Sequence, residues 1–342
     1  MLNTASEASV TVSADTTALR ALGPVWTRLA ETGAATPFQT YAWNLAWWEL
    51  VGERSPLFHL HVVTVTVRGR VALIAPLMVE HTDAGARILR FLSDPWGDYQ
   101  DVVTNLDGED LRVAFTTLNR HLEDGLGTGW DEIRFTEVRA GSRFAAHLIT
   151  APGTEWSATD STLCPTRWLG DGPGSGRNSA GKLARARRLG EVRLTLWNHA
   201  QDIRDRLPDY TAMHVRQWYG RPDCGITFTD PEVARFYLEC PRYLAPAGLL
   251  GLAELTIGTR PAAFYFGFLY RGTFWGYRPA YETQLARLSP GRLLHQLLFQ
   301  QLAETGFHTF DMMRGDFAYK QTLATDNPFN LALTHSGEAG GR

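Results

Sequence analysis

The stretch ARLSPGRLLHQLLFQQLAETG, residues 286–306, decides how the second half of this chain folds. Its leucines recur at intervals of three and four residues, which predicts a helix over residues 291–305 that Gly306 ends. Pro290 and Gly291 stand at the start of this helix, where proline is favoured because a first-turn N–H has no partner within the helix. The remaining N–H groups and the positive end of the helix dipole attract anions, so we predict a pyrophosphate site at Gly291.

Predicted strands flank that helix. Residues 249–257, 261–270 and 273–277 are rich in β-branched and aromatic side chains and are separated by short turns, which predicts a three-stranded meander. A loop over 278–290 leads into the helix, and another strand is predicted at 307–312. The second half is therefore predicted to be a sheet with helices packed on it.

The first half interleaves helices and strands. Apolar residues at helical spacing predict two helices between residues 18 and 49, separated by Pro37. Strands at 57–67 and 71–80 are predicted to form a hairpin closed by Arg68-Gly69. A further strand, helix and strand are predicted at residues 86–92, 110–124 and 132–138. This mixture indicates an α/β (α+β) fold.

Composition narrows the classes of protein. The chain has 342 residues, a formal net charge of −3 and 44% hydrophobic residues, enough for a substantial core and about two domains. Near-neutral charge excludes a chromatin-type basic protein. No apolar run approaches the ~18 residues of a membrane span, and because residues 1–17 are polar we expect no secretory signal there. Three cysteines are too few for a disulfide scaffold, so a cytoplasmic location is expected.

The clearest break in composition is GDGPGSGRNSAG, residues 170–181, which is typical of a linker or loop. It leads into a short basic helix at 182–189. We therefore predict an N-terminal lobe over residues 1–160, a linker and basic helix over 161–190, a C-terminal lobe over 191–330 and a disordered tail over 331–342.

Two kinds of site are excluded. Residues 176–182 match the first seven positions of the phosphate loop G-x-x-x-x-G-K-[ST], but Leu183 replaces the hydroxyl residue that would bind magnesium. His59 and His61 share a strand face near His81, but no carboxylate partner accompanies them. We therefore predict neither a P-loop nucleotide hydrolase nor a metal site.

One family carries these pieces in the same order. The signature of the CelD-like acetyltransferases, a branch of the GNAT superfamily related to the FemAB aminoacyl transferases, resembles Leu288–Leu294, Glu304–Gly306, Phe310-Asp311, Arg314–Asp316 and Tyr319-Lys320. The rest of the pattern resembles Pro37–Gln39, Trp43, Ala46–Trp48, the loop 96–101, Cys164-Pro165 and the basic helix. The resemblance implies two GNAT-like lobes, each a mixed, mainly antiparallel sheet flanked by helices. It also implies an acyl-CoA donor, such as acetyl-CoA, and an amine acceptor.

The resemblance places the donor at the start of the 291–305 helix. The acyl-CoA loop of GNAT enzymes, [QR]-x-x-G-x-[GA], aligns with a segment that contains Arg287, Ser289, Pro290, Gly291 and Arg292. Pro290 and Arg292 replace the two small residues, and proline removes a backbone N–H. Because FemAB-like relatives use an aminoacyl-tRNA donor, acyl-CoA and tRNA both stay open as donors. No metal is implied.

Four residues are candidates for the chemistry. Tyr319 lies where GNAT enzymes often place a tyrosine that protonates the leaving thiolate, and an ordinary pKa of about 10 keeps a phenol protonated at neutral pH. Lys320 could pair with a donor phosphate or an oxyanion. Asp98 and Asp101 could hold the amine and take its proton. The alternatives are packing for Tyr319, an exposed helix position for Lys320 and turn capping for the aspartates.

Further residues are candidates for contact with the substrates. Tyr99 in the 96–101 loop, Trp275 and Tyr277 on one strand face, and Asp316 in a turn are assigned to the acceptor, with core packing and turn formation as alternatives. The basic helix could contact phosphates of CoA or tRNA through Arg185, Arg187 and Arg188. Neither His214, His295 nor His308 has a nucleophile at a recognisable spacing, so none is assigned a role.

The sequence thus favours an acyl-CoA-dependent N-acyltransferase in which an amine attacks the donor directly. An aminoacyl-tRNA-dependent transferase and a non-catalytic binding module are the two alternatives. A monomer or homodimer without a membrane partner is expected, and the acceptor is left open.

Overall fold

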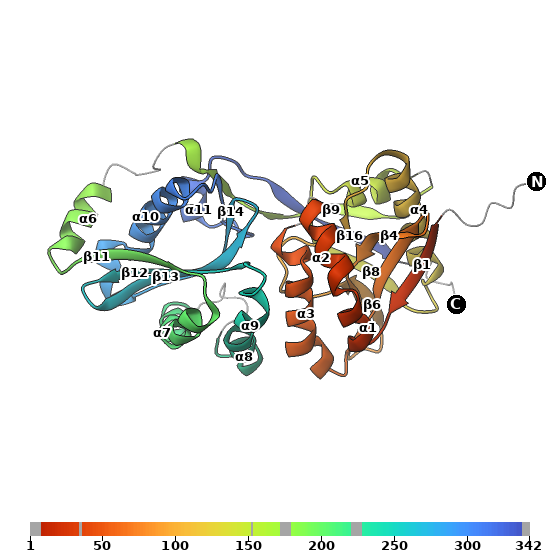
Figure 1. The fold of residues 1–342 in the computed structure, drawn as a ribbon, viewed down its shortest axis with the longest axis horizontal. Coiled ribbons are helices and arrows are strands. Elements are labelled where there is room, and N and C mark those ends of the chain that lie inside the picture. Colours follow the sequence, from red (N-terminus) through yellow and green to blue (C-terminus); the bar gives the residue numbers. More distant parts are fainter. Residues whose placement is uncertain (1–7, 34–35, 152, 172–178, 220–227, 337–342) are drawn as a thin grey trace, which may run out of the picture. The chain divides into compact units, whose positions relative to one another are not determined.

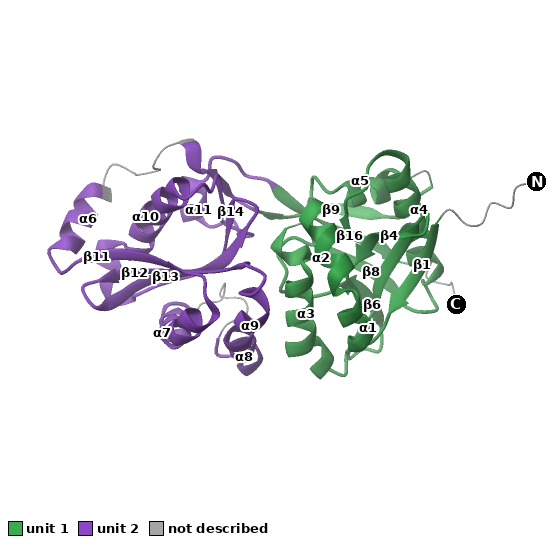
Figure 2. Ribbon diagram, in the orientation of Figure 1, with its two compact units in different colours: residues 1–163, 329–342 green, residues 164–328 purple. Residues whose placement is uncertain are grey.

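The computed structural model describes residues 8–33, 36–151, 153–171, 179–219 and 228–336. The chain divides into two compact units (Figures 1 and 2). Unit 1 consists of Met1–Leu163 together with Phe329–Arg342, and unit 2 consists of Cys164–Pro328. The end of the chain therefore belongs to the same unit as its beginning.

Unit 1 contains two sheets and five helices among its described residues. One sheet has the order β1 (Ala8–Ser13), β3 (Val62–Val67), β4 (Arg70–Ala75), β7 (Val103–Thr104). The other has the order β2 (Phe58–Leu60), β5 (Leu77–His81), β6 (Arg87–Phe91), β8 (Glu132–Arg139), β16 (Phe329–Ser336), β9 (Ser157–Leu163). The helices are α1 (Thr16–Ala21), α2 (Gly23–Thr32), α3 (Tyr41–Leu50), α4 (Gly108–Asp124) and α5 (Arg143–Thr150), with 3₁₀ turns η1 (Pro37–Gln39) and η2 (Gly52–Arg54).

Unit 2 is built on one six-stranded sheet. Its order is β10 (Thr166–Trp168), β15 (Thr309–Asp311), β14 (Thr273–Tyr281), β13 (Arg260–Tyr270), β12 (Leu250–Ile257), β11 (Val192–Trp197). The helices are α6 (Ser179–Arg187), α7 (Ala200–Trp218), α8 (Pro231–Glu239), α9 (Pro241–Leu244), α10 (Pro290–Glu304) and α11 (Ala318–Leu323), with 3₁₀ turns η3 (Leu169–Asp171) and η4 (Thr283–Leu288). Helices α7 and α8 lie on one side of the sheet and α10 and α11 on the other (Figure 1).

The two units repeat one topology. In unit 2, β14 pairs with β15 in parallel and α10 connects them, whereas the other strand pairs of this sheet are antiparallel. In unit 1, β6 pairs with β8 in parallel and α4 connects them. Hairpins precede the parallel pair in both units. The predicted fold of two lobes with mixed, mainly antiparallel sheets flanked by helices is confirmed.

In each unit, one strand of the sheet comes from a part of the chain far from the rest of that sheet. Strand β10 comes directly after β9 of unit 1 along the chain, but it pairs with β15 in the sheet of unit 2. Strand β16 comes after α11 of unit 2 along the chain, but it lies between β8 and β9 in the sheet of unit 1. The prediction of a disordered tail from residue 331 is therefore wrong as far as Ser336, because β16 supplies buried side chains such as Asn330 and Leu333. Residues 337–342 lie outside the described part of the chain.

Most of the predicted linker, residues 161–190, is part of unit 2. Of residues 161–190, β10 and α6 form regular elements of unit 2, while residues 172–178 are outside the described ranges. The strand predicted at 273–277 continues to Tyr281, and part of the loop predicted at 278–290 is the 3₁₀ turn η4. These two differences bring the end of β14 beside the start of α10, where the candidate site lies.

Candidate functional site in unit 2

The sheet of unit 2 opens where β14 and β15 separate. The two strands pair from Thr273 to Trp275, opposite Thr309 to Asp311, and β15 then ends while β14 continues to Tyr281. A bulge lies at the same place in β14. Phe266 of β13 pairs with Arg278 and Gly267 with Gly276, so Tyr277 is an extra residue without a partner in β13. The backbone of β14 beyond this bulge has no strand partner on the β15 side among the pairings of the described residues.

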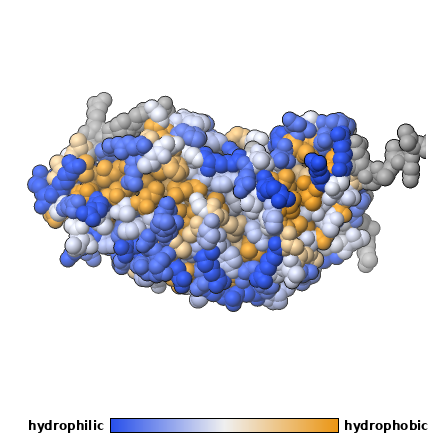
Figure 3. Space-filling model, viewed as in Figure 1, coloured by the Kyte–Doolittle hydropathy of each residue, from blue (hydrophilic) through white to orange (hydrophobic). Residues whose placement is uncertain are grey.

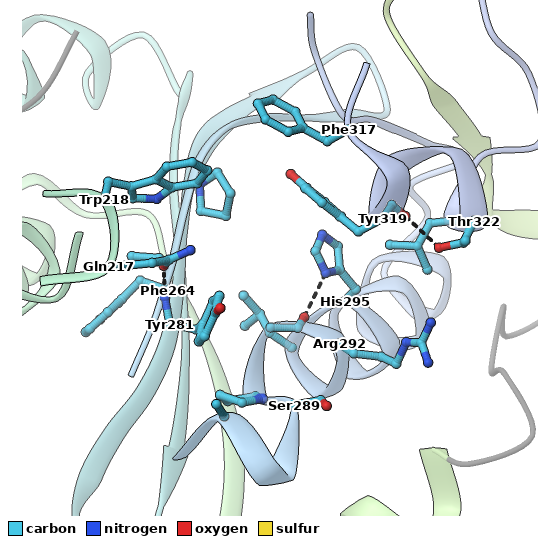
Figure 4. A pocket seen from close by; sticks show the side chains of 17 residues that line it. Gln217, Trp218, Phe264, Tyr281, Ser289, Arg292, His295, Phe317, Tyr319 and Thr322 are labelled. Carbon is cyan, nitrogen blue, oxygen red and sulfur yellow. Dashed lines mark hydrogen bonds between the residues drawn. The ribbon is translucent and has the colours of Figure 1, made fainter. Parts of the chain in front are cut away.

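A pocket of about 380 Å³ lies at this opening (Figure 4). Its walls come from the end of β14, the start of α10, helix α11 and the end of α7, all within unit 2. The side chains are mostly apolar and aromatic, and Figure 3 shows apolar side chains gathered on unit 2 in the region of α10. The residues used below are Trp218, Tyr281, Ser289, Gly291, His295 and Tyr319. A pocket of this size with few polar groups is typical of a small-molecule site.

The start of α10 forms one end of the pocket, as the sequence predicts. Ser289 caps the helix in the left-handed conformation (φ 51°), and its carbonyl accepts the N–H groups of Arg292 and Leu293. Since Pro290 has no N–H, Gly291 has the one first-turn N–H without an acceptor among the described residues. Ser289, Pro290, Gly291 and Arg292 line the pocket, whereas Arg287 is exposed and does not.

A lysine from a distant part of the sequence reaches the same helix start. The Lys182 Nζ donates to Ser289 Oγ at 2.6 Å, so α6 places an ammonium beside α10. Arg292 adds a second, exposed cation at the pocket. Although the phosphate-loop motif that contains Lys182 is incomplete, this lysine contributes positive charge where a helix N-terminus already attracts anions.

Tyr319, a residue of α11, lines the end of the pocket opposite the start of α10. The Tyr319 side chain is 37% exposed, but the protein around its phenol removes water from it and raises its pKa to about 12, against an opposing interaction with the Tyr265 hydroxyl. Its ring lies 5.9 Å from the His295 ring, measured between centroids, and Figure 4 shows the two side chains facing each other. Tyr319 therefore stays protonated at neutral pH and can donate a proton inside the pocket.

His295 is a pocket residue that the sequence prediction missed. Its Nδ1 lies 2.7 Å from the carbonyl oxygen of Gly291, and the side chain is 4% exposed. Burial lowers the pKa of His295 to about 4, with a smaller lowering by the Lys320 charge. The available signal was a histidine within the apolar stripe of the 291–305 helix, a position that leucine otherwise occupies.

Gly276 is required by the phenol of Tyr265 at the point where β14 leaves β15. A Cβ atom on Gly276 would lie 2.8 Å from Tyr265 Cζ and 2.9 Å from its Oη. We expect Gly276→Ala to lower the free energy of unfolding by about 1–3 kcal/mol through overpacking, measured by chemical denaturation. Gly181→Ala in α6, where a Cβ meets no atom within 4 Å, is the control. Equal stability of both variants would contradict this packing.

Lys320 does not line the pocket. It is buried, and its ammonium donates to the carbonyl oxygens of Met313 at 3.0 Å and Arg314 at 2.6 Å. These bonds hold the turn that carries Met313 and Gly315, both with positive φ. Asp316, in the same turn, is exposed, accepts a hydrogen bond from Gln321 and lies outside the pocket. The contacts of Lys320 are those of a structural residue, which differs from the predicted phosphate or oxyanion contact.

Trp275 and Tyr277 also lie outside the pocket lining. The Trp275 indole is buried and donates to the carbonyl of Tyr270 at 3.2 Å. The Tyr277 ring stacks on Tyr237 with centroids 6.4 Å apart. The bulge at Tyr277 breaks the strict alternation on which the prediction of a shared face rested. Residues further along β14, such as Tyr281, line the pocket instead.

Asp98 and Tyr99 fill the corresponding opening of unit 1. Strands β6 and β8 pair only over two residues, and the loop after β6 then pairs with β8 through Gln100 and Val138. Asp98, Tyr99 and Gln100 are 4%, 3% and 1% exposed, and Asn330 of β16 donates to the Asp98 carbonyl. Unit 1 thus occupies with its own chain the place that is a pocket in unit 2.

Asp101 has a different environment from its neighbours in the loop. It lines a separate pocket of about 180 Å³ in unit 1, together with Arg139, Ser142 and Arg143. Burial raises the pKa of Asp101 to about 6, although a hydrogen bond with Ser142 and the arginine charges oppose the rise. Asp101 belongs to unit 1, whereas the residues that line the pocket of unit 2 all belong to unit 2.

Clusters of possible metal ligands and membrane-spanning helices are absent from the described residues. No group of three or more His, Cys, Asp and Glu side chains there is arranged to hold a metal ion. Four of the histidines of unit 1 form two pairs, His59 with His81 and His61 with His121. Among the described helices, none is both long and apolar enough to cross a membrane. Cys224 and the first part of the phosphate-loop motif lie outside the described ranges.

Comparison with known proteins identifies the domain. Residues 175–321 match the family described as "Acetyltransferase (GNAT) domain". No curated protein sequence is significantly similar to the chain.

Solved structures share the fold across nearly the whole chain. FemX is similar over 92% of this chain and 96% of its own, with a TM-score of 0.65 and 10% identity. The C-terminal domain of a putative lysylphosphatidylglycerol synthetase from Agrobacterium fabrum covers 93% and 92%, with a TM-score of 0.59 and 14% identity. A tandem GNAT protein from the clavulanic acid biosynthesis pathway covers 98% and 100%, with a TM-score of 0.52 and 13% identity. Residues 175–321 thus match a GNAT acetyltransferase domain, and the chain as a whole shares its fold with FemX and with a tandem GNAT protein.

Proposed function

We propose that this protein is an N-acyltransferase that moves an acyl group from acyl-CoA to a primary amine in the pocket of unit 2. The observation that carries the proposal is one pocket with an anion-binding helix start, the Gly291 end of α10, and a protonated phenol, Tyr319, among its lining residues. An acyl-CoA has phosphates at one end and a thioester at the other, so its two ends need these two kinds of group.

Different residues of the pocket contact different parts of the donor. The Gly291 N–H, the α10 dipole, Lys182 and Arg292 bind the phosphates. The apolar walls near Trp218 and Tyr281 enclose the less polar part of the donor and keep water away. Tyr319 then lies near the acyl group and supplies a proton to the leaving sulfur.

The reaction needs no covalent enzyme intermediate. The amine nitrogen attacks the thioester carbonyl carbon, a C–N bond forms, and the C–S bond breaks as the tetrahedral intermediate collapses. The sulfur takes the phenolic proton of Tyr319, and the proton that the nitrogen loses restores the phenol, so the products are an amide and a thiol. An acid close to the sulfur speeds this step because it prevents the release of a free thiolate.

The first test of this proposal is donor binding. We expect isothermal titration calorimetry to show binding of acetyl-CoA and of CoA, and Lys182→Ala to weaken CoA binding by about tenfold, which corresponds to about 1.4 kcal/mol. Arg193→Ala is the control, because it removes an exposed arginine paired with Glu191 on β11. Absence of CoA binding by the unaltered protein would overturn the acyl-CoA proposal.

An aminoacyl-tRNA donor is the second candidate. Pro290 and Arg292 stand where the usual acyl-CoA loop has small residues. Helix α6 and the residue after it present exposed Arg185, Arg187 and Arg188 near Lys182 in the sequence. A tRNA has the phosphates that such a helix would bind. This candidate predicts transfer from a charged-tRNA mixture that ribonuclease treatment abolishes, together with no binding of CoA.

A further inference from the structure

The hydrogen bond between His295 and the α10 backbone defines which imidazole nitrogen carries the hydrogen. A carbonyl oxygen only accepts hydrogen bonds, so the contact of 2.7 Å between His295 Nδ1 and Gly291 O requires the hydrogen to be on Nδ1. The Nε2 atom then has a lone pair. It is buried, and it has no hydrogen-bond partner among the described residues.

An unpaired lone pair in this place is costly unless it has a use. Leaving a buried acceptor unsatisfied costs about 1–3 kcal/mol, and a carbon at this position of the ring would avoid the cost. The imidazole is surrounded by the rings of Tyr265, Phe299, Phe310 and Tyr319, with centroid distances of 5.3, 5.7, 5.9 and 5.9 Å. Packing alone would therefore be served as well by a phenylalanine.

We infer that His295 is the proton carrier for Tyr319, an inference that rests on the proposed acyl transfer. Nε2 of His295 takes the proton that the nitrogen loses after attack, and the imidazolium returns a proton to the Tyr319 phenolate. The amine loses one proton, the thiolate gains one from Tyr319, and both side chains end as they began. His295 and Tyr319 both line the pocket, and Figure 4 shows their side chains beside each other.

The charges around His295 suit a carrier that is neutral at rest. Among the described residues, the titratable groups that interact with it are the phenols of Tyr265 and Tyr319 and the Lys320 ammonium, which lowers the pKa of His295. The resting imidazole is therefore neutral and able to accept a proton. Once Tyr319 has become a phenolate, the negative charge beside His295 favours the imidazolium. Proton uptake by His295 is thus tied to proton loss by Tyr319.

Two variants separate this role from packing and from simple hydrogen bonding. His295→Phe keeps a ring among the aromatic neighbours but has no nitrogen. His295→Gln keeps an acceptor oxygen that does not carry a proton at neutral pH. We expect both to lower kcat by about 100-fold, with KM changed less than about twofold. The assay is thiol release from acetyl-CoA with a panel of primary amines, and His308→Phe, at an exposed histidine of unit 2, is the control.

The outcomes distinguish this inference from the proposed function. Transfer by the wild type that persists in His295→Phe or in His295→Gln overturns the carrier role and leaves the proposed function intact. No thiol release by the wild type with any amine overturns both. A second measurement does not need turnover: ¹⁵N NMR of the imidazole should show the neutral form with hydrogen on Nδ1 at about pH 7. A hydrogen on Nε2 instead, or an imidazolium at that pH, overturns the inference.

Discussion

Replacing Tyr319 by phenylalanine is expected to lower kcat for acyl transfer by at least about 100-fold while acetyl-CoA still binds with unchanged affinity. The substitution removes one oxygen and keeps the ring, which packs against His295 and Phe317. Without the phenol, the sulfur leaves as a free thiolate and the barrier for collapse of the intermediate rises. Thiol release under saturating acetyl-CoA measures kcat, and calorimetry with CoA measures binding.

The pH dependence gives an independent test of the same residue. Desolvation of the phenol raises the pKa of the partly exposed Tyr319 to about 12, so the phenol stays protonated to higher pH than an ordinary tyrosine. A general acid works only while it is protonated, and its activity is lost as the pH rises through its pKa. We therefore expect no loss of kcat attributable to Tyr319 below about pH 11, whereas an unshifted tyrosine would lose activity near pH 10.

A matched control separates chemistry from folding. Tyr219→Phe removes the same hydroxyl from a side chain of unit 2 that is 78% exposed, and it should leave kcat unchanged. Retention of full activity in Tyr319→Phe would show that the leaving group receives its proton elsewhere. Donor binding without transfer, in the wild type as in both variants, would favour the alternative of a non-catalytic binding module.

Local patterns were sufficient to predict the helix start that forms one end of the pocket. Pro290 and Gly291 signal a helix start by themselves, and a helix start attracts phosphate for reasons of backbone geometry alone. Tyr319 was predicted from the resemblance to a family signature, and the pocket contains it. The role of each residue stays a proposal, but their place in one pocket is a property of the structure.

Other parts of the site depend on contacts that the sequence does not reveal. Tyr265, Gly276 and His295 come from β13, β14 and α10 and meet only when the sheet and the helix pack together. Lys320 was predicted to face a ligand, but a left-handed turn puts two carbonyls within reach of its ammonium. A one-residue bulge changed which residues of β14 line the pocket. Side-chain direction is set by such details rather than by residue type.

The same limit applies to the fold. Strands next to each other in the sequence were predicted from their hairpin turns, which are local signals. Strands β10 and β16 were missed because their partners are distant: β10 pairs with β15, and β16 pairs with β8 and β9. The segment FNLALTHS of β16 alternates in polarity only weakly, and a Gly-rich stretch follows it, so composition suggested a tail.

Removing β16 should therefore unfold unit 1. A chain truncated after Pro328 lacks the strand between β8 and β9, and it loses Leu333, which is fully buried. It also loses Asn330, whose amide donates to the Asp98 carbonyl and to the Glu137 carboxylate, both at 2.9 Å. Edges of β8 and β9 left unpaired are sites for aggregation. We expect this truncation to give insoluble protein, or soluble protein without the unfolding transition of unit 1 in calorimetry.

Truncation after Ser336 is the matched control, because it removes residues 337–342 and keeps all of β16. It should match the full chain in solubility and in its unfolding transitions. The residues that line the pocket belong to unit 2. The chain that ends at Pro328 therefore also tests whether unit 2 binds CoA when unit 1 is unfolded. A folded, soluble chain ending at Pro328 would mean that β9 can pair with β8 directly, and that the strand between them is dispensable for unit 1.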